Sequence, residues 1–117
     1  GGDKWIGGVL APNGKIYCVP FNSTQILIIN PDDNSTQLIG SFSGIGKWGS
    51  GVLSPNGKIY CIPRESTQIL IINPDDNSTQ LIGSLGSTSY KWVGGVLGLN
   101  GKIYCIPTNS NQILEIS

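Results

Sequence analysis

The sequence predicts an all-β fold built from a four-stranded unit that occurs three times. The stretch from Gly7 to Pro20 recurs as Gly51 to Pro63 and again as Gly94 to Pro107. A fixed period of this length is typical of architectures in which each repeat forms one structural module. No window carries apolar residues at the spacing of an amphipathic helix, and glycine, proline and β-branched residues interrupt the chain throughout. The tryptophans recur with spacings of 43 and 44 residues, at Trp5, Trp48 and Trp92.

The first half of each copy predicts a β-hairpin. Residues Trp5 to Leu10 are glycine-rich and apolar, which suits a strand that runs where neighbouring backbones crowd together, so we place it innermost. The pair Asn13-Gly14 then lies between two apolar runs, a pattern that predicts a type I′ turn with positive φ at both residues. A second strand follows from Gly14 to Pro20.

The second half of each copy predicts two more strands. Residues Gln25 to Asn30 are apolar without alternation, which indicates a strand that is covered on both faces. The cluster from Pro31 to Ser35 is a turn, and Thr36 to Gly40 forms a short, half-polar fourth strand. Four such antiparallel strands describe a blade packed between two others. A β-sandwich is the main alternative, but it does not require a whole module to recur.

The order of short motifs within the repeat resembles a known family. Lys-Trp, Gly-Val-Leu, Pro-Asn-Gly-Lys-Ile-Tyr-Cys, Gln-Ile-Leu-Ile-Ile-Asn-Pro and Gln-Leu-Ile-Gly follow one another. This order resembles the β-propeller blades of the kelch- and NHL-like group, and more narrowly the cnidarian-type repeat behind symmetric eight- and nine-bladed designer propellers. The resemblance covers the whole chain. The repeat departs from WD40 repeats, since it lacks their Gly-His and Trp-Asp pairs, and from kelch repeats, since no distinct Gly-Gly doublet closes its second strand.

The count of blades predicts an assembly. We expect one segment of three blades over residues 1–117, with blades at about 5–41, 48–84 and 92–117 and the last blade lacking its outer strand, so that eleven strands result. Three blades do not close a ring, because propellers typically have about four to eight. Two chains would give a six-bladed homodimer and three a nine-bladed homotrimer. The resemblance to eight- and nine-bladed forms favours the homotrimer.

Composition argues against several partners and most catalytic chemistry. Seven basic and seven acidic residues cancel, so no overall field attracts nucleic acid or an anionic membrane. No apolar run approaches the roughly 20 residues that span a bilayer. The chain has no histidine and thus lacks the most common general base, zinc ligand and partner of a nucleophile. We therefore expect no enzyme, no cofactor, no nucleic-acid partner and no membrane association.

Two further sets of side chains have structural interpretations. The paired acids Asp32-Asp33 and Asp75-Asp76 lie in turn clusters, which favours turn formation over acid–base catalysis, and without EF-hand spacing we predict no metal site there. The cysteines occupy equivalent positions in successive blades and are odd in number, which argues against a disulfide framework. We expect buried free thiols that fill the core, with a ring of metal-binding thiols as the alternative. These cysteines are Cys18, Cys61 and Cys105.

The candidate ligand site consists of the three tryptophans and the lysine that precedes each of them. In a closed ring they would form a circle of aromatic rings and cations near one mouth of the channel, where sugars or other small planar ligands could stack. For each tryptophan we favour packing between adjacent blades over ligand stacking, and for the repeated tyrosines we favour packing more strongly. The predicted site residues are Trp5, Trp48, Trp92, Lys4, Lys47 and Lys91.

Three classes of function therefore remain open. We favour a self-assembling structural or interaction scaffold without catalysis, because the chain is repetitive, neutral and poor in reactive groups. A lectin-like propeller with one sugar or small-ligand site per blade is the second class. An enzyme is the third, and only scattered carboxylates support it.

Overall fold

A computed structural model describes residues 4–42, 47–64, 68–82, 92–107 and 114–116. Within these ranges the chain forms eleven strands and no helix, and hence no helix long and apolar enough to cross a membrane. The first sheet contains β1 (Trp5–Leu10), β2 (Ile16–Pro20), β3 (Ile26–Asn30) and β4 (Ser35–Ile39). The second contains β5 (Trp48–Leu53), β6 (Ile59–Pro63), β7 (Ile69–Asn73) and β8 (Ser78–Ile82). The third contains β9 (Trp92–Leu97), β10 (Ile103–Pro107) and β11 (Leu114–Ile116).

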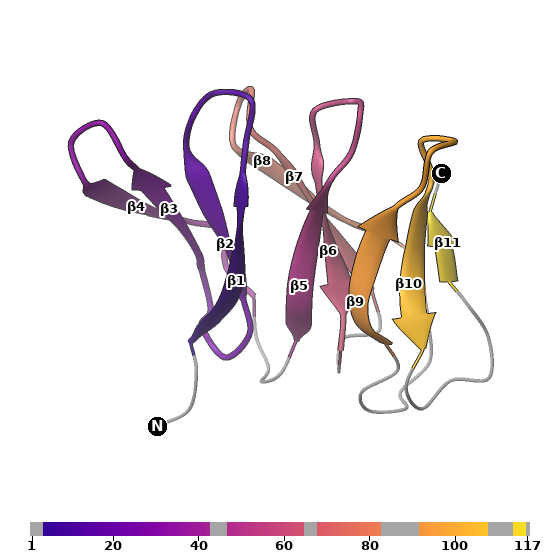
Figure 1. The fold of residues 1–117 in the computed structure, drawn as a ribbon. Coiled ribbons are helices and arrows are strands. Elements are labelled where there is room, and N and C mark those ends of the chain that lie inside the picture. Colours follow the sequence, from indigo (N-terminus) through magenta and orange to yellow (C-terminus); the bar gives the residue numbers. More distant parts are fainter. Residues whose placement is uncertain (1–3, 43–46, 65–67, 83–91, 108–113, 117) are drawn as a thin grey trace.

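All strand pairs are antiparallel, and each sheet follows chain order from its first strand to its last. The three sheets stand side by side like blades (Figure 1), and β5 lies next to β1 and β9. The predicted all-β blade architecture, with its glycine-rich first strand innermost, is therefore confirmed. The third sheet has three strands among the described residues.

The predicted hairpin is confirmed, but the predicted type of its turn is wrong. Gly14 has φ of 86°, whereas Asn13 is not among the described residues with positive φ. The Gly14 amide donates to the Ala11 carbonyl at 3.0 Å, and the Ala11 amide donates to the Lys15 carbonyl at 2.9 Å. This is a type I turn followed by a left-handed glycine, the usual three-residue hairpin loop. Pro12 favours it, because the fixed negative φ of proline suits the second position of a type I turn.

The turn between the third and fourth strands places an asparagine in the left-handed region. Asn34 and its counterpart Asn77 both have φ of 59°, a conformation that asparagine tolerates better than most residues. The Asp33 carboxylate accepts a hydrogen bond from the Ser35 amide at 2.9 Å. The paired acids therefore serve the turn, as the sequence predicts.

The core lies between blades rather than within one. We call the face of a blade that is turned toward the preceding blade its leading face, and the opposite one its trailing face. One cluster joins the trailing face of blade 1 (β1–β4) to the leading face of blade 2 (β5–β8), and contains Val9, Ala11, Tyr17, Val19, Ile26, Ile28, Phe42, Trp48, Ile59, Cys61, Leu70 and Ile72. A second joins blade 2 to blade 3 (β9–β11) through Tyr60, Ile62, Ile69, Ile71, Ile103, Cys105 and Ile116.

Candidate functional site at the open blade faces

The contact between blades 1 and 2 depends on a glycine of the innermost strand. A Cβ atom at Gly51 would lie 2.8 Å from Val9 Cγ2 and 3.1 Å from Val19 Cγ2. Both valines are buried, with 9% and 0% of their surfaces exposed. The absence of a side chain at Gly51 therefore lets the two valines of blade 1 reach the backbone of blade 2.

The second contact between blades repeats this arrangement. A Cβ atom at Gly95 would lie 2.9 Å from Ile62 Cδ1 and 3.1 Å from Val52 Cγ2. These two side chains stand at the positions that Val19 and Val9 occupy one repeat earlier. Two branched apolar side chains over one glycine are thus the recurring unit of blade packing.

A buried tyrosine adds a polar contact between blades 1 and 2. The Tyr17 hydroxyl donates to Asn77 Oδ1 at 2.7 Å and accepts from Asn13 Nδ2 at 3.1 Å. Asn13 Nδ2 also lies 3.3 Å from the Pro74 carbonyl, to which it can donate. The hairpin turn of blade 1 is therefore held against the β7–β8 turn of blade 2.

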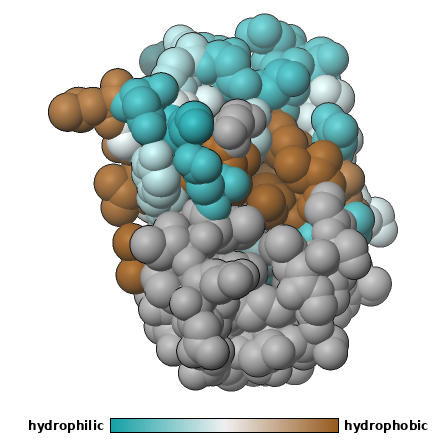
Figure 2. All heavy atoms as spheres, turned by 90° about the vertical axis from the view of Figure 1, so that its right-hand side faces the viewer, coloured by the Kyte–Doolittle hydropathy of each residue, from teal (hydrophilic) through white to brown (hydrophobic). Residues whose placement is uncertain are grey.

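The trailing face of blade 3 has no described blade over it. Val96 and Ile106, the counterparts of Val9 and Val19, are 58% and 46% exposed. Figure 2 faces the side of the molecule that carries β10 and β11, and shows hydrophobic side chains in its middle below a hydrophilic upper part. The positions that bury apolar surface inside the molecule thus present it to solvent here.

The leading face of blade 1 is open in the same way. Gly8, the counterpart of Gly51, is exposed, and Leu10 is exposed whereas its counterpart Leu53 packs against the first core cluster. Four more positions are only half-buried although their counterparts in blade 2 are fully buried: Ile16, Cys18, Leu27 and Ile29.

Sequence reasoning predicted open faces but did not identify the residues that form them. Gly8, Asn34, Val96 and Ile106 were not predicted as a site, and Tyr104 was considered only among the repeated tyrosines, for which packing between blades was favoured. Aligning the three copies by position would have found them, because each has a counterpart that lies at a contact between blades.

The predicted tryptophans hold their own blades together where their side chains are described. Trp5 Nε1 donates to the Gln25 carbonyl at 2.8 Å, and Trp48 Nε1 donates to the Gln68 carbonyl at 2.9 Å. Trp48 is 2% exposed and meets the Phe42 ring edge-on, with 5.4 Å between centroids. Trp48 therefore has the packing position between blades, while Trp5 is half-buried at the open leading face.

The predicted lysines differ from one another in their surroundings. Lys4 is exposed, whereas Lys47 is 4% exposed, and burial lowers the pKa of Lys47. The Lys47 amide donates to the Phe21 carbonyl, and its carbonyl accepts from the Arg64 amide. Lys91 and the side chain of Trp92 lie outside the described residues, so the predicted circle of three pairs stays a prediction.

The cysteines are free thiols that follow the burial of their faces. Cys61 and Cys105 are buried, whereas Cys18 on the open leading face is half-buried. Burial raises the pKa of all three thiols, that of Cys105 to about 11. No group of three cysteines or acidic residues that could hold a metal ion occurs among the described residues.

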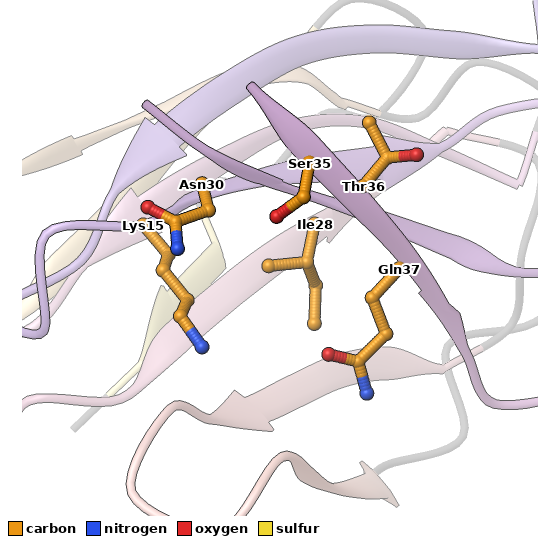
Figure 3. Close-up of a pocket in the computed structure, with 6 residues that line it drawn as sticks. All are labelled: Lys15, Ile28, Asn30, Ser35, Thr36 and Gln37. Carbon is orange, nitrogen blue, oxygen red and sulfur yellow. The ribbon is translucent and has the colours of Figure 1, made fainter. Parts of the chain in front are cut away.

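Small polar cavities occur at equivalent places in blades 1 and 2. The cavity of blade 1 has a volume of about 100 Å³ and that of blade 2 about 50 Å³. Figure 3 shows the first, with Ile28 between the side chains of Lys15 and Gln37. Drug-sized ligands occupy about 300–1,000 Å³, so these cavities suit a few water molecules or one small substituent. The remaining residues that line the first cavity are Asn30, Ser35 and Thr36, and the second is lined by Lys58, Ile71, Asn73, Ser78, Thr79 and Gln80.

Three antiparallel sheets that meet along their first strands define a β-propeller segment, and solved structures support this class. Virginiamycin B lyase from Staphylococcus aureus, a propeller, matches with a TM-score of 0.79 at 19% sequence identity, over 97% of this chain and 38% of that chain. A catalytically inactive variant of this lyase, with histidine replaced by alanine and solved with quinupristin, matches with a TM-score of 0.72 at 17% sequence identity. The match covers 96% of this chain and 40% of that chain. Hydrazine synthase from Kuenenia stuttgartiensis matches with a TM-score of 0.71 at 12% sequence identity, over 97% of this chain and 32% of that chain.

These likenesses establish the fold alone. The chain spans about two fifths of the length of the lyase chains that it matches. No family profile and no curated protein sequence matches it.

Proposed function

We propose that this chain is a non-catalytic β-propeller segment that assembles with copies of itself into a closed ring and serves as a structural or interaction scaffold. One observation carries the proposal. Val96 and Ile106 are 58% and 46% exposed at one end of the segment, although their counterparts Val9, Val19 and Ile62 are at most 9% exposed inside it. Exposed apolar surface that is rimmed by polar groups is typical of protein–protein interfaces.

The shape of the two open faces supports copies of this chain as the partner. One end of the segment presents the branched side chains and the other presents the glycine, so a trailing face fits a leading face and two like faces do not fit each other. A contact between unlike surfaces produces a ring when its rotation closes. We propose a nine-bladed homotrimer, with a six-bladed homodimer as the alternative, because the repeat resembles the kelch- and NHL-like group and its cnidarian-type eight- and nine-bladed forms.

The chemistry of the chain supports a role without catalysis. This chain contains no histidine, the most common general base and partner of a catalytic nucleophile. The Asp33 and Asp76 carboxylates accept hydrogen bonds from the amides of Ser35 and Ser78 within their turns. Propellers support many unrelated functions, so the fold by itself does not choose among them.

Mass in solution tests the assembly directly. Light scattering after size exclusion at micromolar concentration should give three times the mass of the 12.4 kDa chain. Ile106→Lys should give a folded monomer, because a charge would be buried in the contact between copies while the residue is already exposed within one copy. Leu81→Lys is the matched control. Leu81 is exposed although both faces of its blade are covered, so this variant should keep the mass of the wild type.

The outcomes separate the alternatives. A wild-type mass of two chains would replace the homotrimer with the six-bladed homodimer. A monomeric wild type with a native circular dichroism spectrum would overturn the assembly.

A lectin-like propeller with one site per blade is the second candidate. The repeated polar cavities favour it as anchor points for a single substituent of a sugar, because amide, hydroxyl and ammonium groups of the kind that bind sugars recur at the same place in two blades. The predicted tryptophan–lysine pairs belong to this candidate as well. Sugars should then raise the melting temperature of the wild type, and Gln37→Ala should reduce the shift. A glycan array without hits, together with no stabilisation by any sugar, would exclude it.

A further inference from the structure

We propose that copies join by repeating the internal contact between blades in the same register. The Tyr104 hydroxyl of one copy donates to Asn34 of the next, and Val96 and Ile106 of the first pack on Gly8 of the second. This inference rests on the proposed assembly and specifies the residues that form it.

The apolar half of this contact follows from two existing examples. At both internal contacts a pair of branched side chains covers a glycine of the next blade, with at least one nearest Cβ distance below 3.0 Å. The trailing face of blade 3 carries the same pair, and the leading face of blade 1 carries the same glycine. A register shifted by two residues toward Leu10, which lies on the same face as Gly8, would place the pair over a side chain instead of the glycine.

The polar half is already formed on both surfaces. Asn100 Nδ2 donates to the Tyr104 hydroxyl at 2.8 Å, as Asn13 does to Tyr17, which leaves the hydroxyl proton of Tyr104 available. Asn34 has the φ of 59° that Asn77 has while it accepts from Tyr17. Asn34 is also exposed, whereas Asn77 is half-buried under the preceding blade.

One position makes the contact between copies different from the internal ones. Tyr17 and Tyr60 pair across their sheets with Ile28 and Ile71, but Tyr104 pairs with Glu115. The Glu115 carboxylate lies 3.4 Å from Lys102 Nζ, and both side chains are more than two fifths exposed. Docking would remove water from this ion pair, and desolvation of a pair often costs more than its attraction returns. We therefore expect copies to bind more weakly than adjacent blades of one chain, and Glu115→Ile to tighten the assembly about tenfold.

Cysteine cross-linking tests the register. The proteins carry Cys18→Ser, because Cys18 Sγ lies 3.9 Å from where a Gly8 Cβ would be. In this background Gly8→Cys with Val96→Cys should form disulfides between chains on oxidation, since side chains at the internal counterparts approach within bonding reach. Non-reducing electrophoresis should show covalent dimers and then one closed species. Val9→Cys with Gly51→Cys is the matched internal control and should cross-link within one chain.

A second measurement separates register from loss of folding. Tyr104→Phe and Asn34→Gly should each weaken association about tenfold, and the double variant should be no weaker than either one, because both remove the same hydrogen bond. Glycine keeps the left-handed turn at this position. Additive effects, or no cross-link in a protein that remains trimeric, would overturn the register while the proposed assembly stands. A monomeric wild type would instead overturn the assembly itself.

Discussion

Blades 1 and 2 contain an identical segment, residues 23–41 and 66–84, but bury it differently. Leu70 and Ile72 are fully buried, whereas Leu27 and Ile29 are half-buried. Pro74 is buried under the turn of the preceding blade, whereas Pro31 is exposed. Because the two segments do not differ in sequence, the neighbouring blade alone decides which of their side chains form a core. The environment of a residue in this repeat is thus set by its place in the row of blades.

The largest expected difference between covered and open faces is in thiol reactivity. The thiolate is the reactive form, and burial raises the pKa of the fully buried Cys61 more strongly than that of the half-buried Cys18. In the Ile106→Lys monomer at pH 8, a thiol reagent should modify Cys18 at least about a hundredfold faster than Cys61. In the assembled wild type, the rate at which the reagent modifies Cys18 should fall toward the rate for Cys61. Equal rates for Cys18 and Cys61 in the monomer would contradict the comparison.

The same glycine-to-alanine change should have opposite consequences at the two kinds of face. Gly51→Ala places a methyl group 2.8 Å from Val9 Cγ2 in a filled contact, and overpacking of this kind costs about 1–3 kcal/mol of unfolding free energy. Urea denaturation of variants in the Ile106→Lys background measures this cost. Gly8→Ala, its matched control, should change stability by less than about 1 kcal/mol there: no described blade covers it, and the one close contact of its Cβ, with Ile16 Cγ2 at 3.0 Å, is to a half-buried side chain that can shift. If Gly8→Ala lost as much unfolding free energy as Gly51→Ala, the added methyl group would be strained by contacts within its own blade and not by the neighbouring blade.

A smaller effect is expected from the tyrosine hydroxyls. Tyr17→Phe removes a donor to Asn77 across the contact between blades 1 and 2 and should cost about 1–2 kcal/mol of unfolding free energy. The Tyr60 hydroxyl accepts from Asn56 at 3.1 Å within its own turn and contacts no other polar group among the described residues. Tyr60→Phe should therefore cost less than about 1 kcal/mol. Equal costs would mean that the bond between blades adds nothing to the bond within the turn.

The fold could be predicted from the sequence, because its signals are local and occur three times. The strand of Gln25 to Asn30 and the hairpin at Asn13-Gly14 both appear as expected, although the turn type was wrong because Pro12 favours a type I turn. The residues at the open faces could not be predicted from one copy of the repeat. Gly8 and Gly51 have similar sequence surroundings, and only the arrangement of blades shows that one is covered and the other is not.

The smallest expected effect concerns pH and compares Lys47, which is covered, with Lys4, which is exposed. Burial lowers the pKa of Lys47 below its ordinary value of 10.5. Between the folded and unfolded pKa values, the unfolded chain binds more protons, so the free energy of unfolding rises with pH in that window. Below the folded pKa the full cost of the buried charge is present.

Lys47→Met should remove this rise, because methionine has no proton to lose and keeps the backbone hydrogen bonds to Phe21 and Arg64. Urea denaturation measures the unfolding free energy at about pH 8 and about pH 10. Its rise between these pH values should be smaller in this variant than in the wild type, by less than about 1 kcal/mol. Lys4→Met should leave the rise of unfolding free energy with pH as it is in the wild type. If the unfolding free energy of both variants changes with pH as that of the wild type does, burial between blades does not destabilise the charged form of Lys47 relative to water. The covered and open ends of the repeat would then differ in packing alone.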